Sequence, residues 1–142
     1  MLPTFENIVV PVDFTAKNEA ALDIAFTIAQ QNRGRVALLH VIEVIDNVPQ
    51  DELTSFYERL TSRAEKELKT RSQRFRDAGL TVESKIRRGK RLKEIVDDAW
   101  ERKADLVVVS SHKVDPSAAL RSLGTLSYQV SVLCPCAVLL VK

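Results

Sequence analysis

The chain has 142 residues, a length typical of one domain that can bury a substantial core. Hydrophobic residues make up 45% and charged residues 28%, with 4 Gly and 5 Pro, which excludes disordered and fibrous proteins. The 21 basic and 19 acidic side chains leave a formal charge of +2, so no global field favours non-specific nucleic-acid binding. We expect a single domain over residues 1–142.

The N-terminal segment, the apolar runs and the two cysteines all bear on the cellular location of the protein. The N-terminal segment carries Glu6 and lacks the basic start of a secretory signal, and the longest apolar runs are only strand-sized. Cys134 and Cys136 lie too close together for an ordinary structural disulfide and lack the spacing of a zinc site or a redox C-x-x-C motif. They are expected to be small buried residues around a turn. These features favour a cytoplasmic protein without a membrane span.

Apolar strand-like runs alternate with segments of helical period, which predicts a parallel sheet with crossover helices. The first strand, 8–12, is unbroken in its hydrophobicity, as is typical of a central strand buried on both faces. Thr15 is the expected N-cap of a helix that ends at Gly34. A second strand over 36–41 leads to a long helix with apolar residues three, four and seven apart, which Gly79 should end.

The second half of the chain continues the alternation. A third strand, 80–86, alternates apolar with polar residues, which indicates one wet face and a position at a sheet edge. The next helix should bury an apolar stripe, and a fully apolar strand follows over 106–109. A last helix should end at Pro135, which cannot continue the backbone ladder, before a closing strand over 137–141. The stripe consists of Leu92, Ile95, Val96, Ala99 and Trp100.

Polar residues follow the two most apolar strands, where a ligand site is expected in an open parallel sheet. Asp13 follows the first strand, and Ser110 and Ser111 follow the fourth. Ligands in such sheets bind beyond the carboxyl ends of the strands, where the order of connection reverses. Free N–H groups and the positive end of a helix dipole meet near Gly124 and Thr125, which favours an anionic ligand there.

Segments spread along essentially the whole chain match one family in order and spacing. They are NIVVPVDFT, LLHVIE, RRGKRLKEIVDDAWERKADLVVVSS and GTLSYQVSVLCPCAVLLVK. Together they resemble the universal stress protein family. The resemblance implies an α/β fold with an open five-stranded parallel sheet in the order 3-2-1-4-5 and helices on both faces. This Rossmann-like fold, of the adenine nucleotide alpha hydrolase-like type, places the third strand at an edge and the first beside the fourth.

The loop that holds phosphates in ATP-binding members of this family has the pattern G-x-x-G-x9-G-[S/T]. Gly124 and Thr125 match its end, whereas Ser111 and Val114 stand at the positions of its two earlier glycines. Val114 is the more serious departure, because a β-branched residue tolerates positive φ poorly and adds bulk where phosphate oxygens would lie. Ser111 can still offer a hydroxyl and an amide.

The resemblance implies further positions of a nucleotide site. Asp13 matches an acidic residue that contacts the adenosine part of ATP, although capping its own turn explains it equally well. Val41 matches a position whose backbone meets adenine, although a buried strand end also explains a valine. The cofactor-binding candidates are Pro11, Asp13, Val41, Ser110, Ser111, Val114, Gly124 and Thr125.

Other chemistries have less support. Ser111 and His112 beside Asp13 suggest a hydrolase, but adjacent side chains diverge and no G-x-S-x-G elbow is present. No Cys/His cluster has metal-ligand spacing, so neither catalytic nor metal-binding residues are expected. An edge strand with one solvent-exposed face and an exposed turn explain the six basic residues from Lys85 to Lys93. No aromatic residues lie between them to stack on bases. Specific nucleic-acid binding is therefore not expected.

Two function classes remain, both within the resemblance. The first is a non-enzymatic stress-response or regulatory homodimer that requires no cofactor, binds ATP weakly or not at all and acts on an unidentified protein partner. The second is an ATP-binding switch with slow hydrolysis, in which the modified loop still holds ATP and magnesium. The altered loop favours the first. Its homodimer should form through the apolar last strand, 137–141, because an open sheet edge invites pairing and family members pair there.

Overall fold

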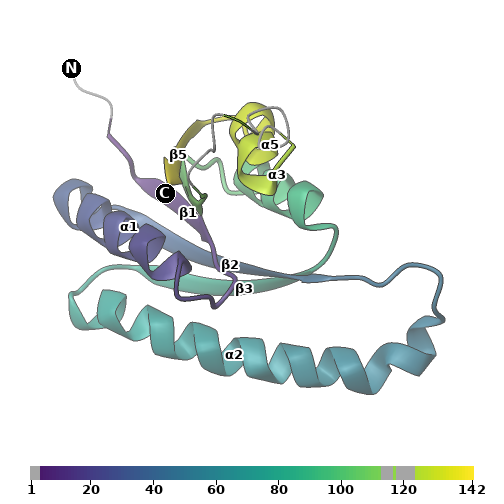
Figure 1. Cartoon of the computed structure of the whole chain (residues 1–142). Helices are drawn as coiled ribbons and strands as arrows, with labels where there is room; N and C mark the ends of the chain where they lie inside the picture. The colour runs from purple at the N-terminus through teal and green to yellow at the C-terminus, as the bar shows by residue number, and fades with distance from the viewer. Residues whose placement is uncertain (1–3, 113–116, 118–123) are drawn as a thin grey trace.

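The computed structural model describes residues 4–112, 117 and 124–142 of the chain. In this part, five parallel strands form one sheet in the order β3-β2-β1-β4-β5, which confirms the expected α/β fold and strand order (Figure 1). The strands are β1 (Asn7–Pro11), β2 (Arg35–Glu43), β3 (Val82–Gly89), β4 (Leu106–Ser110) and β5 (Ala137–Val141). The helices are α1 (Asn18–Asn32), α2 (Thr54–Asp77), α3 (Arg91–Glu101) and α5 (Leu126–Leu133), with a short 3₁₀ helix η1 (Gln50–Leu53) before α2.

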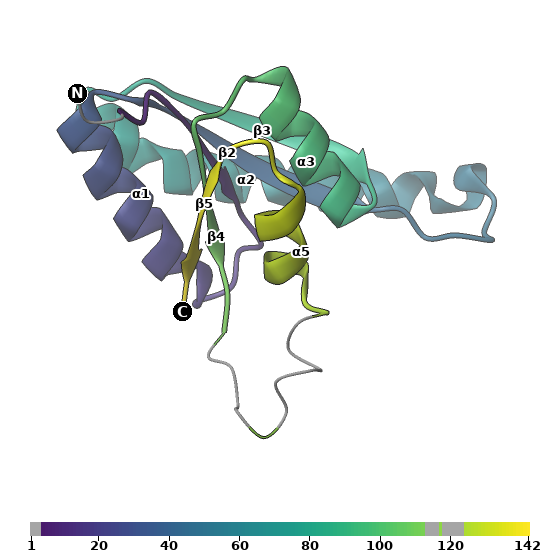
Figure 2. The same ribbon diagram turned by 90° about the horizontal axis from the view of Figure 1, so that it is seen from above.

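The core has two layers, one on each face of the sheet (Figure 2). Val10 and Val108 point toward α1 and α2 and belong to one apolar cluster. Val9 and Val107 point the opposite way and pack with residues of α3 and α5. Burial on both faces is what the unbroken hydrophobicity of β1 and β4 predicted, and each such side chain stabilises the fold by about 1.5–3 kcal/mol.

The boundaries of α1 differ from expectation at both ends. Thr15 is not its N-cap: the Thr15 N–H and hydroxyl both donate to Asp13 Oδ1, and the helix begins at Asn18. The turn at Asp13 satisfies these groups locally, so that helical hydrogen bonding starts later. At the other end, Arg33 rather than Gly34 takes the left-handed conformation, with φ 53°. Gly34 follows it where a Cβ would lie 2.6 Å from a neighbouring carbonyl oxygen.

The buried stripe of α3 is narrower than predicted. Ile95 and Ala99 are buried, but Trp100 is 64% exposed. A fully buried acidic residue, Asp98, shares the inner face instead. The search for apolar residues did not include Asp98, because burying an unpaired charge is costly. Asp98 is tolerated on the inner face because its charge is paired.

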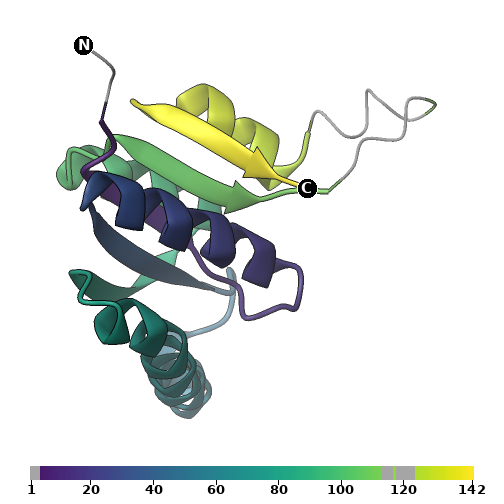
Figure 3. The ribbon, with the colours of Figure 1, turned by 90° about the vertical axis from the view of Figure 1, so that its left-hand side faces the viewer.

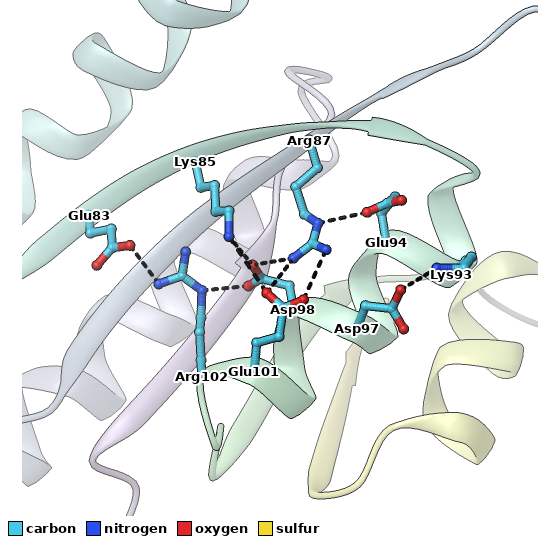
Figure 4. A network of polar contacts seen from close by, with 9 residues as sticks. All are labelled: Glu83, Lys85, Arg87, Lys93, Glu94, Asp97, Asp98, Glu101 and Arg102. Carbon is cyan, nitrogen blue, oxygen red and sulfur yellow. Dashed lines mark hydrogen bonds and ion pairs between the residues drawn. The ribbon is translucent and has the colours of Figure 1, made fainter.

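An ion-pair network around Asp98 joins the edge strand β3 to α3 (Figure 4). Arg87 Nη1 lies 3.2 Å from Asp98 Oδ1, and Arg102 Nε donates to Asp98 Oδ2 at 2.5 Å. Arg87 Nε also donates to Glu94 at 2.7 Å, and Lys85 Nζ lies 3.5 Å from Asp98. The network accounts for two of the six basic residues between Lys85 and Lys93. Of the other four, Arg88 contacts Thr61 and Tyr57, Lys90 contacts Asp46, Arg91 contacts Glu43, and Lys93 contacts Asp97.

The opposite edge of the sheet is β5. Val138 and Leu140 pack into the cluster formed with α3 and α5, so Leu139 points to the other face, where it is 38% exposed. On that face α1 lies over the middle of the sheet, and none of the described helices covers β5 (Figure 3). The last strand thus presents an open edge and an exposed leucine together.

Candidate functional site

A small cavity lies at the carboxyl ends of β1, β2 and β4, where the direction of strand connection reverses. Its volume is about 70 Å³. It brings together four of the predicted site residues, namely Pro11, Asp13, Val41 and Ser110. The other lining residues are Val12, Asn18, Leu39, His40, Arg91, Ile95, Val109 and Leu126.

The carboxylate of Asp13 is held by its own turn. Its Oδ1 accepts the Thr15 N–H at 3.0 Å and the Thr15 hydroxyl at 2.7 Å. The next residue, Phe14, has φ 64°, which is uncommon for a bulky side chain, and its carbonyl accepts a hydrogen bond from Arg71 on α2. The turn-capping role that the sequence left open for Asp13 is therefore present, and Asp13 also lines the cavity.

His40, in the second half of β2, is held in a stack of aromatic rings. Its ring lies on Phe14 with centroids 4.3 Å apart, and the Arg71 guanidinium lies 5.1 Å from the Phe14 centroid. His40 Nδ1 is 2.6 Å from the carbonyl oxygen of Val12, which can only accept, so we assign the ring proton to Nδ1. Burial lowers the pKa of His40, although the Val12 contact opposes the shift. A neutral imidazole is the favoured form in the wall of the cavity.

Asn18, at the start of α1, is the most buried polar group of the site, with 1% of its surface exposed. Its Nδ2 donates to the Pro11 carbonyl at 3.2 Å and to the Ser110 hydroxyl at 2.9 Å. Because a carbonyl only accepts, the amide nitrogen must face Pro11, and Oδ1 has no hydrogen-bond partner among the described residues. The sequence analysis missed Asn18. Its burial could have been predicted, since Asn18 lies three and four residues before the buried Ala21 and Leu22 and therefore on the same helix face.

Of the predicted phosphate-loop residues, the three that the structure describes, Ser111, Gly124 and Thr125, do not line the cavity. The Ser111 N–H donates to the Val141 carbonyl at 2.7 Å, and its hydroxyl is 2.9 Å from the hydroxyl of Ser127. Ser127 is also 3.4 Å from the hydroxyl of Thr125, which caps α5 by accepting the Tyr128 N–H. The sequence analysis did not identify Ser127. Val114 lies outside the described residues.

Neither a metal centre nor a reactive thiol is found in the described residues. Among them, no group of three or more His, Cys, Asp or Glu side chains is placed to hold a metal ion. Burial raises the pKa of Cys134 to about 11 and also raises that of Cys136, so both thiols stay protonated near neutral pH. In the same part of the chain, no helix has the length and apolar character needed to cross a bilayer.

Comparisons with known proteins agree on one family. The model of the universal stress protein family matches residues 4–142. Universal stress protein YxiE of Bacillus subtilis (strain 168) is 25% identical over 148 residues, covering 97% of this chain and 99% of that protein. Universal stress protein UspA from Lactobacillus plantarum has a similar structure, with a TM-score of 0.86, 22% identity and coverage of 99% of this chain and 100% of that one. The structure of the Archaeoglobus fulgidus universal stress protein in complex with dAMP gives a TM-score of 0.68 at 22% identity, covering 99% and 100%.

Proposed function

Because the chain belongs to the universal stress protein family, we propose that it is a non-enzymatic stress-response or regulatory homodimer that binds ATP weakly or not at all. The observation that carries the proposal is the internal pairing of Ser111, at the position of a phosphate-loop glycine. Its N–H is used by Val141 and its hydroxyl by Ser127.

Phosphate binding by a loop depends on several donors that converge on one anion. At Ser111 the N–H donates to Val141 and the hydroxyl is paired with the Ser127 hydroxyl, so a phosphate would have to replace both contacts. Losing one or two charge-assisted hydrogen bonds of about 1.5–3 kcal/mol each would weaken binding by roughly one to four decades. Such a loss would move a micromolar ATP site out of the cellular range.

The size of the cavity also supports weak binding. At about 70 Å³ it is much smaller than the roughly 300–1,000 Å³ of a typical ligand pocket. A complete nucleotide would therefore need the walls to move apart, which would subtract from its binding free energy.

A second candidate function is a switch that binds ATP with magnesium, favoured by the nucleoside end of the cavity. Pro11, Asp13 and Val41 remain together there, independently of the phosphate loop. The Archaeoglobus fulgidus relative was solved with dAMP, a nucleotide with one phosphate. Weak nucleotide binding is thus compatible with the altered loop.

The homodimer is proposed to form through β5. An edge strand exposes unpaired N–H and C=O groups, and a second β5 related by a two-fold axis would satisfy both rows and cover Leu139. That the protein acts on an unidentified protein partner and that it is cytoplasmic both remain predictions. The six basic residues of 85–93 each have a described partner, which supports the expectation that they do not bind nucleic acid specifically.

A thermal-shift titration with ATP and magnesium tests the proposal at the lowest cost, because a ligand that binds only the folded state must raise the apparent Tm. We expect little or no change at millimolar ATP. A large, saturable rise at micromolar ATP would instead favour the switch.

A further inference from the structure

We infer that the groove between β3 and α2 binds an extended, acidic segment of a partner protein, which adds a strand to the sheet beside β3. This β3 groove has a volume of about 490 Å³. The inference rests on the proposed function, because it gives a chemical class to the protein partner expected there. The residues of the groove that carry it are Ser84, Ile86 and Arg88 of β3 and Glu65, Lys69 and Arg76 of α2.

The outer side of the β3 backbone has no strand beside it in the described part of the chain. At the start of the parallel pairing with β2, the Val36 N–H donates to the carbonyl of Thr81 at 2.9 Å. Because backbone groups alternate in direction along a strand, odd-numbered residues of β3 face β2 and even-numbered ones face outward. The outward N–H and C=O groups can pair with an added strand. They belong to Val82, Ser84, Ile86 and Arg88.

The side chains of the same even-numbered residues lie on the face of the sheet that α2 covers. Figure 1 shows α2 running along β3. Ile86 packs into the apolar cluster on that face, and Arg88 donates to the Thr61 hydroxyl of α2 at 3.1 Å. Ser84 is exposed, so α2 leaves part of this edge open. In a strand added beside β3, every second side chain would therefore enter the β3 groove.

The β3 groove has an excess of positive charge. Three cations line it, Lys69, Arg76 and Arg88, against one acidic residue, Glu65. Arg88 contacts neutral groups of α2, and neither Lys69 nor Arg76 has an ion pair among the described residues.

This charge decides which strand fits the edge. Basic residues on an edge strand hinder pairing with neutral or basic strands, whereas glutamates or aspartates that enter the groove would meet unpaired cations. A second copy of this chain would bring its own basic β3 to the same edge and be repelled. An acidic segment of another protein is therefore the occupant that the groove favours.

The probe is a short fluorescein-labelled peptide of alternating threonine and glutamate, which presents its glutamates on one face when extended. Fluorescence polarisation at physiological salt should show saturable binding of this peptide when the full chain is added at up to millimolar concentration. The same peptide with lysine in place of glutamate is the charge control and should not bind.

N-methylation distinguishes strand addition from mere attraction between charges. In an extended peptide the N–H groups of the glutamates and those of the threonines point to opposite edges, so only one set can pair with β3. Methylation of one set should abolish binding, and methylation of the other should leave the affinity within about twofold.

Lys69→Glu plus Arg76→Glu should weaken binding of the peptide by about tenfold or more, since like charges then face its glutamates. Both side chains are exposed, so the fold should tolerate the change. Arg59→Glu plus Lys66→Glu is the matched control. It makes the same change in net charge on the same helix, at exposed residues that do not line the groove, and should bind like the wild type.

Absence of binding to the wild type, equal binding of the two N-methylated peptides, or an equal effect of the two double variants would overturn the inference. Tighter binding of a single-stranded oligonucleotide would also overturn it and would assign the groove to nucleic acid. These outcomes are separate from a failure of the proposed function, which would show as tight ATP binding by the unmodified chain.

Discussion

The hydroxyl oxygens of Ser111 and Ser127 lie 2.9 Å apart and link the end of β4 to the first turn of α5. Ser127 is buried, so this contact is protected from water. The Ser111 N–H also donates to the Val141 carbonyl, which extends the pairing of β4 with β5 by one residue. Both polar groups that Ser111 could offer to a phosphate thus have partners within the protein.

The ion pairs of α3 predict a sharp contrast between two adjacent carboxylates. Asp98→Ala should lower the free energy of unfolding by about 3 kcal/mol, because it leaves Arg87 and Arg102 without a buried counter-charge. Asp97→Ala should have a much smaller effect, since Asp97 pairs only with exposed Lys93 among the described residues. Urea denaturation of both variants measures the difference. Equal losses of stability would show that the network around Asp98 does not support the fold.

The lowered pKa of His40 predicts a pH dependence of stability. A base whose pKa is lower in the folded than in the unfolded protein binds more protons when unfolded. Its stabilising contribution is therefore present above the unfolded pKa of about 6.5 and is lost as the pH falls toward the folded value. Arg91 and Arg63 oppose protonation of the ring, and Asp13 favours it.

His40→Asn is the matched variant, because an asparagine amide can replace the Nδ1 donor toward Val12 and does not titrate. Between pH 7 and pH 5 the free energy of unfolding should fall more steeply for the wild type than for this variant. Parallel curves would indicate that His40 has no part in the acid sensitivity.

The proposed dimer predicts that Leu139→Lys weakens self-association, because it places a charge where two copies of β5 would meet. Ile45→Lys is the control, since Ile45 is also an exposed apolar residue but belongs to the segment between β2 and η1. Figure 1 shows the connection from β2 to α2 apart from β5. Sedimentation velocity at micromolar concentration should show a dimer for the wild type and the control and a monomer for Leu139→Lys. A monomeric wild type would remove the dimer from the proposed function.

Unbroken apolar runs predicted β1, β4 and β5 to within one residue at each end, whereas the alternating pattern over 80–86 misplaced β3, which spans Val82–Gly89. Strand 137–141 was predicted with its observed bounds. The buried polar residues could not be found in this way. Asn18 is tolerated through Ser110, 92 residues away in the chain, and Asp98 through cations on β3, so each depends on partners that only the folded sheet brings together.

The sequence predicted only part of the candidate site. Pro11, Asp13, Val41 and Ser110 meet in the cavity because the carboxyl ends of neighbouring parallel strands must lie close together. Local pattern gave no indication that Ser111 would pair with Ser127, because both hydroxyls have several acceptable partners in an unfolded chain.

The central claim concerns ATP, and isothermal titration calorimetry with ATP and magnesium tests it most directly. The wild type should give little or no binding heat, whereas Ser111→Gly plus Val114→Gly should bind measurably, because the double variant restores both glycines and releases the Ser111 hydroxyl contact. A restored loop that still failed would place the obstruction around Asp13 and Val41. Tight ATP binding by the unmodified chain would contradict the claim outright.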